Sequence, residues 1–475
     1  MTVALESLPR KQLPVFPGWL AALGPGIVWM ALAQGSGELI WWPYMIAKYG
    51  LTFLFLLLPA CLLQYPLTVE IGRYTLATGE SIFHGFFRLN RGLGIFLWIL
   101  MTLSFLWFGA FASAGGTALA ALTGFPGEWS ARGQTLFWGY MTIAIFFIAL
   151  LLSPVIYTLI EWFMKCVATV TLVGMLWACI QPDVIAVIPK FLQGLIGPVA
   201  PWPRAWDPAD ATKLLTAITF AGLGGFWILF YSYWLHDKGS GMAAHNVRLT
   251  GLMNKTDEIT VLTGNIPEES TQNAVRWKQW LKYLRIDAII GISGNILTTL
   301  MTCLLAYALL FPNGLLPQDY NLAVVQASFF EVAWGQFGRI LFLVVAGAFL
   351  ADTWLATVDA VARIQAEILH IIFPGSRRWS LKFLYYIIVC VLTLITCITM
   401  LFEAPGPLIL LSAVIGFCGT VIFPVALYLL NYRLVPASTP AFIKPARGSA
   451  WLLWLSFCAY LILALLYIYM LIPDF

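Results

Sequence analysis

The sequence has few charged side chains. Asp, Glu, Lys and Arg make up 10% of its 475 residues, and hydrophobic residues make up 61%. Soluble domains carry roughly 25% charged and roughly 45–50% apolar residues. A water-soluble chain could not bury this much apolar surface, so the composition indicates a polytopic membrane protein in contact with the lipid bilayer. The net charge of +4 is small, which argues against a nucleic-acid partner.

The sequence also lacks the motifs of common enzymes and metal-binding proteins. Its eight cysteines fall in apolar segments without paired metal-ligand spacing, so we expect them to be free thiols buried against lipid or packed helices. It has no Gly-rich nucleotide loop, no metal-binding triad and no Ser-His-Asp arrangement outside apolar segments. We therefore expect neither an enzyme nor a cofactor, apart from a bound sodium ion. No obligate protein partner is evident.

Long apolar runs dominate the chain. A helix needs about 20 apolar residues to cross a bilayer, and many of these runs reach that length. The hydropathy predicts an all-α fold with eleven transmembrane helices, at approximately 17–47, 50–75, 93–123, 134–153, 155–180, 213–236, 284–311, 334–370, 380–402, 407–432 and 449–472.

The distribution of Lys and Arg in the loops predicts the orientation. One side collects most of these residues, including those of the 237–281 loop, and this side is expected to be cytoplasmic. The amino terminus is then cytoplasmic and the carboxyl terminus lies outside, as in a multi-pass protein of a bacterial inner membrane. Basic residues alternate with Trp277, Trp280 and Tyr283 at the end of the loop, which is typical of an interfacial helix.

The first span carries the most informative feature. Residues 24–46 are long enough to cross the bilayer but are interrupted by Gly35, Ser36, Gly37 and Glu38. An interrupted helix is tolerated at membrane depth only where it lines a cavity, because lipid offers no hydrogen bonds to unpaired backbone. An ionisable side chain at that depth is by default a candidate functional group. The pattern predicts a binding site at this break.

A second interrupted span lies five spans later. Residues 213–236 contain Gly222, Gly224 and Gly225, followed by an aromatic run that ends at His236. Discontinuous helices at corresponding positions of two inverted repeats hold the substrate and ion sites of many secondary transporters. Glycines also allow close helix packing, so this cluster gains its meaning from the spacing to the first break.

Several motifs resemble those of the natural resistance-associated macrophage protein (Nramp) family, proton-coupled transporters of divalent transition metals. The similar stretches are GPG at 24–26, LLQ at 62–64 with Thr78-Gly79, AGGTALAALTGFP at 114–126, LIEW at 159–162, Leu235-His236, and LLSAVIGFCGTVIFPVALYLLN at 410–431 around Pro424. The resemblance covers nearly all of the spans.

The resemblance implies a LeuT-type fold. A single transporter domain over residues 1–475 would consist of two inverted five-helix repeats, at about 17–180 and 213–432. One extra helix at 449–472 and the cytoplasmic loop at 237–281 complete it. Spans one and six are expected to be discontinuous.

The metal-site motifs of the family are missing. Its Asp-Pro-Gly-Asn falls on residues 35–38 and its Met-Pro-His on Leu229, Phe230 and Tyr231. The acidic pair that the family uses for proton movement falls on Phe108 and Phe111. These replacements remove the mixed soft and hard ligands that suit manganese or iron. Because a fold alone does not carry function, the cargo is expected to have changed.

The candidate substrate site is formed by the two breaks. Glu38 is placed at the start of the outer half of span one, where a helix dipole favours a carboxylate; it either caps that helix or binds a small cation with carbonyls near Ala33 and Gln34. The uncovered backbone N–H groups could instead hold a small anion. The proposed substrate-binding residues are Gly35, Ser36, Gly37, Glu38, Gly225, Leu229, Phe230, Tyr231 and Ser232.

Span eight offers candidate ligands for a hard cation. In transporters of this architecture it commonly faces span one and contributes oxygens to a sodium ion. Together with Glu38, the candidates are Asp352, Thr353, Thr357 and Asp359. The two aspartates are about two helical turns apart and therefore share a face; they could equally be bonded to buried donors. Arg363, Glu367 and His370 are expected to be interfacial.

One further pair of charges is spaced for contact. In span five, Glu161 and Lys165 lie at i and i+4 and are expected to form a structural or gating salt bridge.

Secondary transport is the function that these observations favour. The first hypothesis is a small inorganic anion such as bicarbonate, driven by sodium rather than by protons. An alternative is a divalent metal cation, Mg²⁺ or Mn²⁺, with Glu38 as its main ligand. A small organic solute such as an amino acid is a third possibility, against which the bulky aromatic residues of span six argue.

Overall fold

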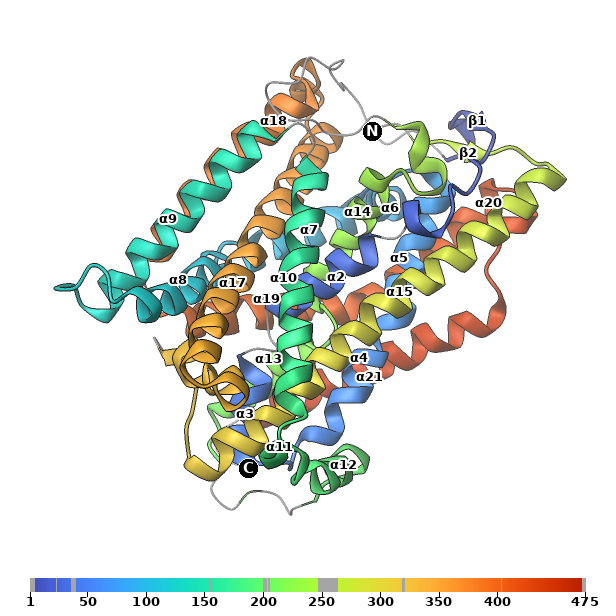
Figure 1. Cartoon of the computed structure of the whole chain (residues 1–475). Helices are drawn as coiled ribbons and strands as arrows, with labels where there is room; N and C mark the ends of the chain where they lie inside the picture. The colour runs from blue at the N-terminus through green and yellow to red at the C-terminus, as the bar shows by residue number, and fades with distance from the viewer. Residues whose placement is uncertain are drawn as a thin grey trace.

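The structure is a computed structural model of the whole chain. It describes residues 5–22, 24–35, 40–153, 156–199, 203, 206–246, 264–317, 321–402 and 404–471. Nearly all of these residues lie in helices, as the apolar runs predicted (Figure 1).

The first half of the chain forms fourteen α-helices and one short strand. They are β1 (Arg10–Lys11), α1 (Trp19–Ala22), α2 (Pro25–Ala33), α3 (Trp41–Tyr49), α4 (Leu57–Leu62), α5 (Gln64–Thr78), α6 (Ile82–Leu89), α7 (Arg91–Phe105), α8 (Gly109–Thr123), α9 (Ala131–Leu152), α10 (Ile156–Cys179), α11 (Pro182–Ile185), α12 (Ile188–Ile196), α13 (Asp210–Phe220) and α14 (Phe230–Lys238).

The second half continues with longer helices. They are β2 (Ile266–Pro267), α15 (Thr271–Leu305), α16 (Leu322–Gln326), α17 (Ser328–Ile372), α18 (Leu381–Thr399), α19 (Pro405–Tyr428), α20 (Val435–Ser438) and α21 (Arg447–Leu471). The 3-10 helix η4 (Gly225–Leu229) precedes α14, and the π-helix η10 (Leu429–Leu434) follows α19.

Ten membrane-length apolar segments occur in the described ranges. They match the second to eleventh predicted spans, for example Ala131–Leu152 against 134–153 and Leu381–Thr399 against 380–402. The first predicted span is represented by α2 and α3, which are separated by undescribed residues 36–39. The all-α membrane fold is confirmed, and the count of eleven stays a prediction.

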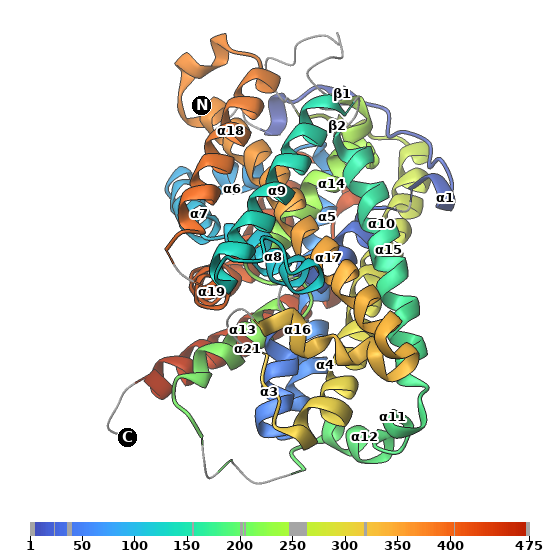
Figure 2. The ribbon, with the colours of Figure 1, turned by 60° about the vertical axis from the view of Figure 1, so that its left-hand side comes forward.

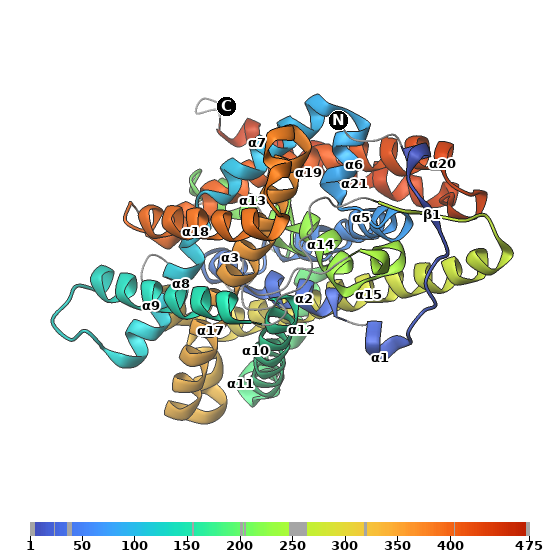
Figure 3. The same ribbon diagram turned by 90° about the horizontal axis from the view of Figure 1, so that it is seen from above.

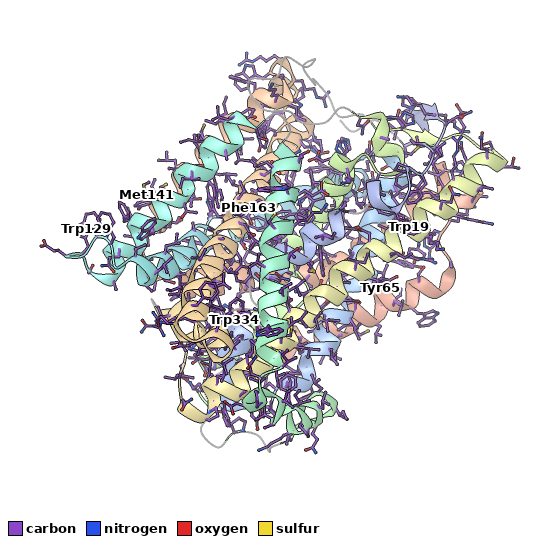
Figure 4. The ribbon with its side chains drawn as sticks, viewed as in Figure 1. Trp19, Tyr65, Trp129, Met141, Phe163 and Trp334 are labelled. Carbon is purple, nitrogen blue, oxygen red and sulfur yellow. The ribbon has the colours of Figure 1, made fainter. Side chains whose placement is uncertain are left out.

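The sixth span lies at the centre of the molecule. The most apolar stretch of this span, within Asp210–Lys238, is entirely buried. In the corresponding stretch of α21 only 17% of the residues are buried. The peripheral helices α9 and α21 turn most of their side chains outward; Figure 4 shows Met141 on the outer side of α9, and this side chain is 42% exposed. A central span wrapped by the others is where a transport site is expected.

Span eight is the principal packing partner in the core. Helix α17 runs between α8 and α10 and also contacts α18, while α15 packs along α2 (Figure 1). The backbone of α17 departs from helical geometry at Gly335, whose φ of +56° favours glycine. The long helix is therefore kinked near one end.

The two ends of the bundle carry different elements. Helices α6 and α14 lie at the end that carries β1 and β2, while α3, α11 and α12 lie at the opposite end (Figure 2). We call these the inner and outer ends, after the orientation predicted from Lys and Arg. That orientation itself stays a prediction.

The aromatic segment before span seven is not an interfacial helix, contrary to prediction. It is the first part of α15, and its Trp277, Trp280 and Tyr283 are buried. The N-terminal segment covers them: Trp280 Nε1 donates to the Pro14 carbonyl at 2.9 Å, and Tyr283 Oη to the Ala22 carbonyl at 3.0 Å. Strand β1 pairs in parallel with β2 beside this contact. The chain's own amino-terminal segment thus occupies the surface that was expected to contact lipid.

The cysteines were predicted to be free thiols that face either lipid or packed helices, and all eight are free. Cys61 and Cys303 are buried, but Cys166, Cys390, Cys418 and Cys458 are exposed on the helix surfaces. Apolar segments place these thiols at membrane depth, and only the packing decides whether they face helices or lipid.

Candidate functional site: the two helix breaks

The end of α2, just before the predicted break of span one, packs tightly against span eight. Helix α2 ends at Ala33, and a Cβ at Gly35 would overlap Thr353 Oγ1 and lie 2.7 Å from the Phe349 carbonyl oxygen. Glycine is therefore required sterically at this position. Ser36, Gly37 and Glu38 lie outside the described residues, so the predicted roles of these three residues remain predictions.

The break of span six is built from glycine and left-handed backbone. Helix α13 ends at Phe220, and positive φ angles follow at Gly222, at Leu223 and at Gly225, the first residue of η4. Gln64 of α5 lies beneath this break, because its Nε2 is 3.1 Å from the position that a Cβ of Gly224 would take. The predicted discontinuity of span six is present in the structure.

The break of span six is also anchored to span ten. The Gly225 N–H donates to Thr420 Oγ1 of α19 at 3.0 Å. A Cβ on Gly225 would lie 3.4 Å from Gly416 Cα. The absence of a side chain at both glycines therefore lets the backbones of spans six and ten approach closely.

The predicted substrate residues of span six are fully buried. Tyr231 Oη donates to Asp287 Oδ2 at 2.8 Å, and Ser232 Oγ donates to the Leu229 carbonyl at 2.8 Å while accepting from the Ile82 N–H. The hydroxyls that were expected to bind a substrate therefore make hydrogen bonds within the protein. Leu229 and Phe230 contribute apolar packing.

An aromatic wall replaces the family's polar residues. The ring of Trp227 lies 4.6 Å from that of Phe105, 5.2 Å from that of Phe220 and 6.0 Å from that of Phe111. Phe230 packs on Phe105 at 5.2 Å. Phe111, at the position of a family acid, is thus part of an apolar wall.

The four candidate ligands of span eight lie in different surroundings. Thr353 faces the break of span one, and Thr357 Oγ1 accepts from Trp227 Nε1 of span six at 3.2 Å. Asp359 accepts from Arg363 Nε at 2.9 Å and from Tyr385 Oη at 2.6 Å, so buried donors already satisfy its charge. Of the two expectations for Asp359, the contacts match the buried ion pair. Cation binding by all four side chains stays untested.

Asp352 differs from Asp359 in having no partner. Its carboxylate is buried, and neither oxygen accepts a hydrogen bond from any described residue. An ionised carboxylate in such a place is costly unless it is paired with a cation. Successive side chains of a helix are rotated by about 100°, so Asp352 does not point in the same direction as Thr353. It points between the side of α17 that faces α8 and the side that faces span one.

Three buried amides were not recognised from the sequence as site residues. Gln34 precedes the first break, Gln64 lies against the second, and Asn295 is in α15. Both polar atoms of each glutamine, and Nδ2 of Asn295, have no hydrogen-bond partner among the described residues. Buried amides are nearly always paired, so unpaired amides beside both breaks indicate groups held ready for a ligand. The only sequence signal was the Gln in the LLQ motif.

A transition-metal site is not seen where the structure can be assessed. Among the described residues, no three His, Cys, Asp or Glu side chains are grouped so that they could hold a metal ion. The retained chemistry at the breaks consists of amides, hydroxyls, backbone groups and one unpaired carboxylate.

The inner half of span six is held by one buried and one partly exposed ion pair. Asp237 pairs with Arg363 of α17, and Lys238 Nζ lies 2.9 Å from Glu161 Oε1 of α10. The predicted contact of Glu161 with Lys165 is confirmed at 2.6 Å. Arg363, Glu367 and His370 are 3–6% exposed, and their placement at the depth of the membrane interface stays a prediction. They are buried because α14 and α6 cover this end of α17.

A polar cluster around His84 joins three elements beside these pairs. His84 Nδ1 is 3.2 Å from Glu367 Oε1 of α17, and His84 Nε2 is 3.9 Å from Glu80. Glu367 also accepts from Ser81 Oγ at 2.6 Å and from Tyr233 Oη of α14 at 2.5 Å. Burial would lower the pKa of His84, but the charges of Glu80 and Glu367 outweigh burial and raise it above 6.5.

Glu80 shows the opposite shift. Burial would raise its pKa, but the positive charge of His84 and the hydrogen bond from Arg88 hold the pKa of Glu80 below its ordinary value. Arg88 Nη2 donates to Glu80 Oε1 at 2.5 Å. The cluster therefore favours the charged forms of His84, Glu80 and Arg88.

The outer half-helices are connected to each other. Asp210 of α13 is within 2.6 Å of Lys48 Nζ of α3 and within 2.7 Å of Lys213 Nζ. Tyr44 and Tyr49 of α3 also donate to its carboxylate, at 3.1 and 2.7 Å. One buried carboxylate thus joins the outer parts of spans one and six.

Comparison of whole structures identifies proteins of the same fold. The manganese transporter of Eremococcus coleocola, as a variant, superposes with a TM-score of 0.63 at 15% identity, over 98% of this chain and 90% of that one. Its complex with an aromatic bis-isothiourea compound gives 0.61 at 14% identity over the same shares. MhsT in complex with L-phenylalanine gives 0.58 at 14% identity, over 96% and 99%.

Sequence comparison detects no matching protein-family model and no matching curated protein. All three superposed structures are membrane transporters and none is an enzyme. At this identity the likeness shows the fold alone, and it confirms the fold that the Nramp-like motifs implied. The chain therefore has the LeuT-type fold of a manganese transporter, with amides and aromatic rings at its helix breaks.

Proposed function

We propose that this protein is a secondary transporter that carries a small inorganic anion such as bicarbonate together with sodium. The observation that carries the proposal is the pair of buried glutamines, Gln34 and Gln64, whose side chains have no hydrogen-bond partner among the described residues and which lie beside the two predicted breaks. Discontinuous helices of this fold are where transporters bind substrate and coupling ion.

Amide groups suit a small oxyanion. Each amide offers two N–H donors and one acceptor, and bicarbonate likewise presents both acceptors and a donor. Gln64 lies against Gly222 and Gly224, where backbone in unusual conformations adds further polar groups. The aromatic wall around Trp227 leaves little room, which favours a cargo of few atoms.

Span eight supplies oxygens for sodium. The Phe349 carbonyl and the Thr353 hydroxyl face Gly35, and Asp352 offers an unpaired carboxylate one residue before Thr353. Hard oxygen ligands suit sodium and not a soft metal. A bound sodium would neutralise Asp352 and reduce the repulsion between this carboxylate and a nearby anion.

A divalent cation is the second candidate. The unpaired Asp352 is the observation that favours it, because two carboxylates, Asp352 and Glu38, would suit a hard, partly hydrated ion such as Mg²⁺. A small organic solute has less support, since Phe105, Trp227 and Phe230 fill the space beside span six.

Reconstituted protein can distinguish these candidates. Liposomes containing a pH-sensitive dye report bicarbonate entry as lumenal alkalinisation, with and without an inward sodium gradient, and parallel assays measure Mn²⁺ and Mg²⁺ uptake. We expect sodium-dependent bicarbonate entry. Sodium-independent Mn²⁺ or Mg²⁺ uptake that is abolished by Glu38→Gln would overturn the anion proposal.

A charge change at the amide provides a sharper test. Gln64→Glu keeps the side chain's shape but places a carboxylate beside the second break, so it should abolish anion transport. Gln134→Glu is the matched control, because Gln134 belongs to the peripheral helix α9. Its side chain donates to the loop carbonyls of Gly124 and Pro126. Equal activity of the two variants would contradict the assignment of Gln64. Asp352→Asn should remove the dependence on sodium.

A further inference from the structure

A cavity lies away from the helix breaks. It has a volume of about 820 Å³ and opens between the end of span ten and the start of span eleven. Helices α19, α20 and α21 lie along the same edge of the molecule as α6 (Figure 3). The wall of the cavity includes Tyr428, Tyr432, Arg433, Lys444, Trp451 and Trp454.

The cavity carries unbalanced positive charge. Arg433 and Lys444 are both exposed, and neither forms an ion pair within the described part of the chain. The carboxylate that reaches the cavity wall is Glu70, which accepts from Tyr432 Oη at 3.3 Å and is already paired with Arg73 at 3.0 Å. Two cations therefore face an open cavity without an acidic partner.

Aromatic rings form the rest of the wall. Tyr428 and Tyr432 stack with ring centres 5.3 Å apart, and Trp454 lies 5.4 Å from Tyr428. Trp451 is 77% exposed. The π-helix η10 (Leu429–Leu434) continues α19 here, and such wide turns occur frequently at functional sites.

The cavity lies at the boundary of the membrane. It is formed where two membrane-length segments, Pro405–Ser438 and Gly448–Leu471, begin or end. Trp and Tyr gather at the headgroup level of bilayers, and basic pockets between helices on the cytoplasmic side bind anionic headgroups. The Lys and Arg distribution assigns this end to the cytoplasmic side.

We propose that this cavity binds the headgroup of an anionic phospholipid. Arg433 and Lys444 would contact its phosphate, and the first N–H groups of α21 favour the same charge. The rings of Tyr428, Trp451 and Trp454 would pack on the glycerol and upper acyl chain. Since Tyr432 Oη lies 2.6 Å from Ser449 Oγ of α21, a bound lipid would brace the junction of spans ten and eleven.

Lipid binding to the purified full-length protein tests this proposal. Native mass spectrometry would compare phosphatidylglycerol with phosphatidylcholine, using wild type and the double variant Arg433→Gln/Lys444→Gln. Each basic residue near an anionic surface contributes about 1 kcal/mol, so phosphatidylglycerol binding should weaken about ten- to thirty-fold. The double variant Arg91→Gln/Lys278→Gln is the charge-matched control, because both residues are exposed at other places.

The control should retain the preference for phosphatidylglycerol. Equal loss in both double variants would overturn the proposal, since it would reflect net charge alone. Retained binding in the Arg433/Lys444 variant would overturn it too. A parallel titration with inorganic phosphate separates the two sources of this ligand chemistry: stabilisation by phosphate as strong as by the lipid would refute a lipid site. A melting curve checks that each variant is folded.

Discussion

The two halves of the sixth span are held by ion pairs that differ in exposure. At the outer end, the side chain of Asp210 is buried, but its partners Lys48 and Lys213 are 25% and 22% exposed. At the inner end, Arg363, Asp237 and Asp359 are 5%, 7% and 3% exposed. Lys238, which pairs with Glu161 at the same inner end, is 19% exposed. Water can reach the lysines as their pairs separate, whereas Arg363 and its two aspartates would be separated in a nearly dry interior.

This difference bears on alternating access. A transporter of this fold must open each end in turn, and the free-energy cost of opening includes the desolvation of the charges left behind. The outer link joins the two half-helices α3 and α13 to each other, while the inner link ties α14 to α17, α10 and the His84 cluster. We therefore expect the outer end to open at a lower cost than the inner end.

The largest effect is expected from Arg363→Gln. This change leaves Asp237 and Asp359 buried without their cation, and breaking a buried pair in this way costs about 3–5 kcal/mol. Thermal unfolding in detergent, followed by intrinsic fluorescence, should show a strongly lowered melting temperature or loss of folded protein. A melting temperature unchanged from wild type would remove the basis for calling the inner link the stronger one.

A smaller effect is expected from Asp210→Asn. The two lysines that lose their carboxylate can take up water, so the loss should be about 1.5–3 kcal/mol, the range of hydrogen bonds to charged groups. Hydrogen–deuterium exchange should rise in α3 and α13 while α14 keeps its protection. Equal deprotection of α14 would show that the two ends do not open separately.

The His84 cluster should make the stability of the inner end depend on pH. The folded-state pKa of His84 is raised above its ordinary value of 6.5. The contribution of His84 to the free energy of unfolding is therefore complete below pH 6.5 and is lost as the pH rises through the raised pKa. Melting temperatures measured from pH 6 upward should fall, by less than the effect of Asp210→Asn. His84→Gln should flatten this slope, and an unchanged slope would assign it to another group.

The smallest effect is expected from Arg339→Gln. Arg339 lies in α17 like Arg363, but its pair with Glu331 at 3.3 Å is 38% and 41% exposed. Exposed pairs contribute about 0–1 kcal/mol. This variant is the control for the removal of an arginine from that helix, and a melting temperature as low as that of Arg363→Gln would undermine the argument from burial.

The spans could be predicted closely because lipid imposes a local rule. A helix that crosses a bilayer must be long and apolar, so predicted and observed spans such as 93–123 and Arg91–Thr123 nearly coincide. The interruption of span six was visible as a glycine cluster. The extension of α15 back to Thr271 was not, because it depends on the amino-terminal segment that covers Trp277 and Trp280.

The site was predicted less completely. The sequence predicted both breaks and the loss of the family's ligands, but it could not show that Tyr231 is bonded to Asp287 or that Asp359 is bonded to Arg363. It also missed Gln64 and Asn295, because an amide in an apolar helix looks the same whether its hydrogen bonds are made or left open. Only the partners found in space distinguish the two.

The sequence by itself determined the membrane class, nearly every span and the place where span six breaks, since hydropathy and glycine act locally along the chain. The tertiary structure decided which polar groups are paired. Burial makes an unpaired group costly, and pairing depends on residues far apart in sequence, such as Asp237 with Arg363. For that reason, only the fold separates the ion pairs that close the two ends from Gln34, Gln64 and Asp352, which stay unpaired within the described chain.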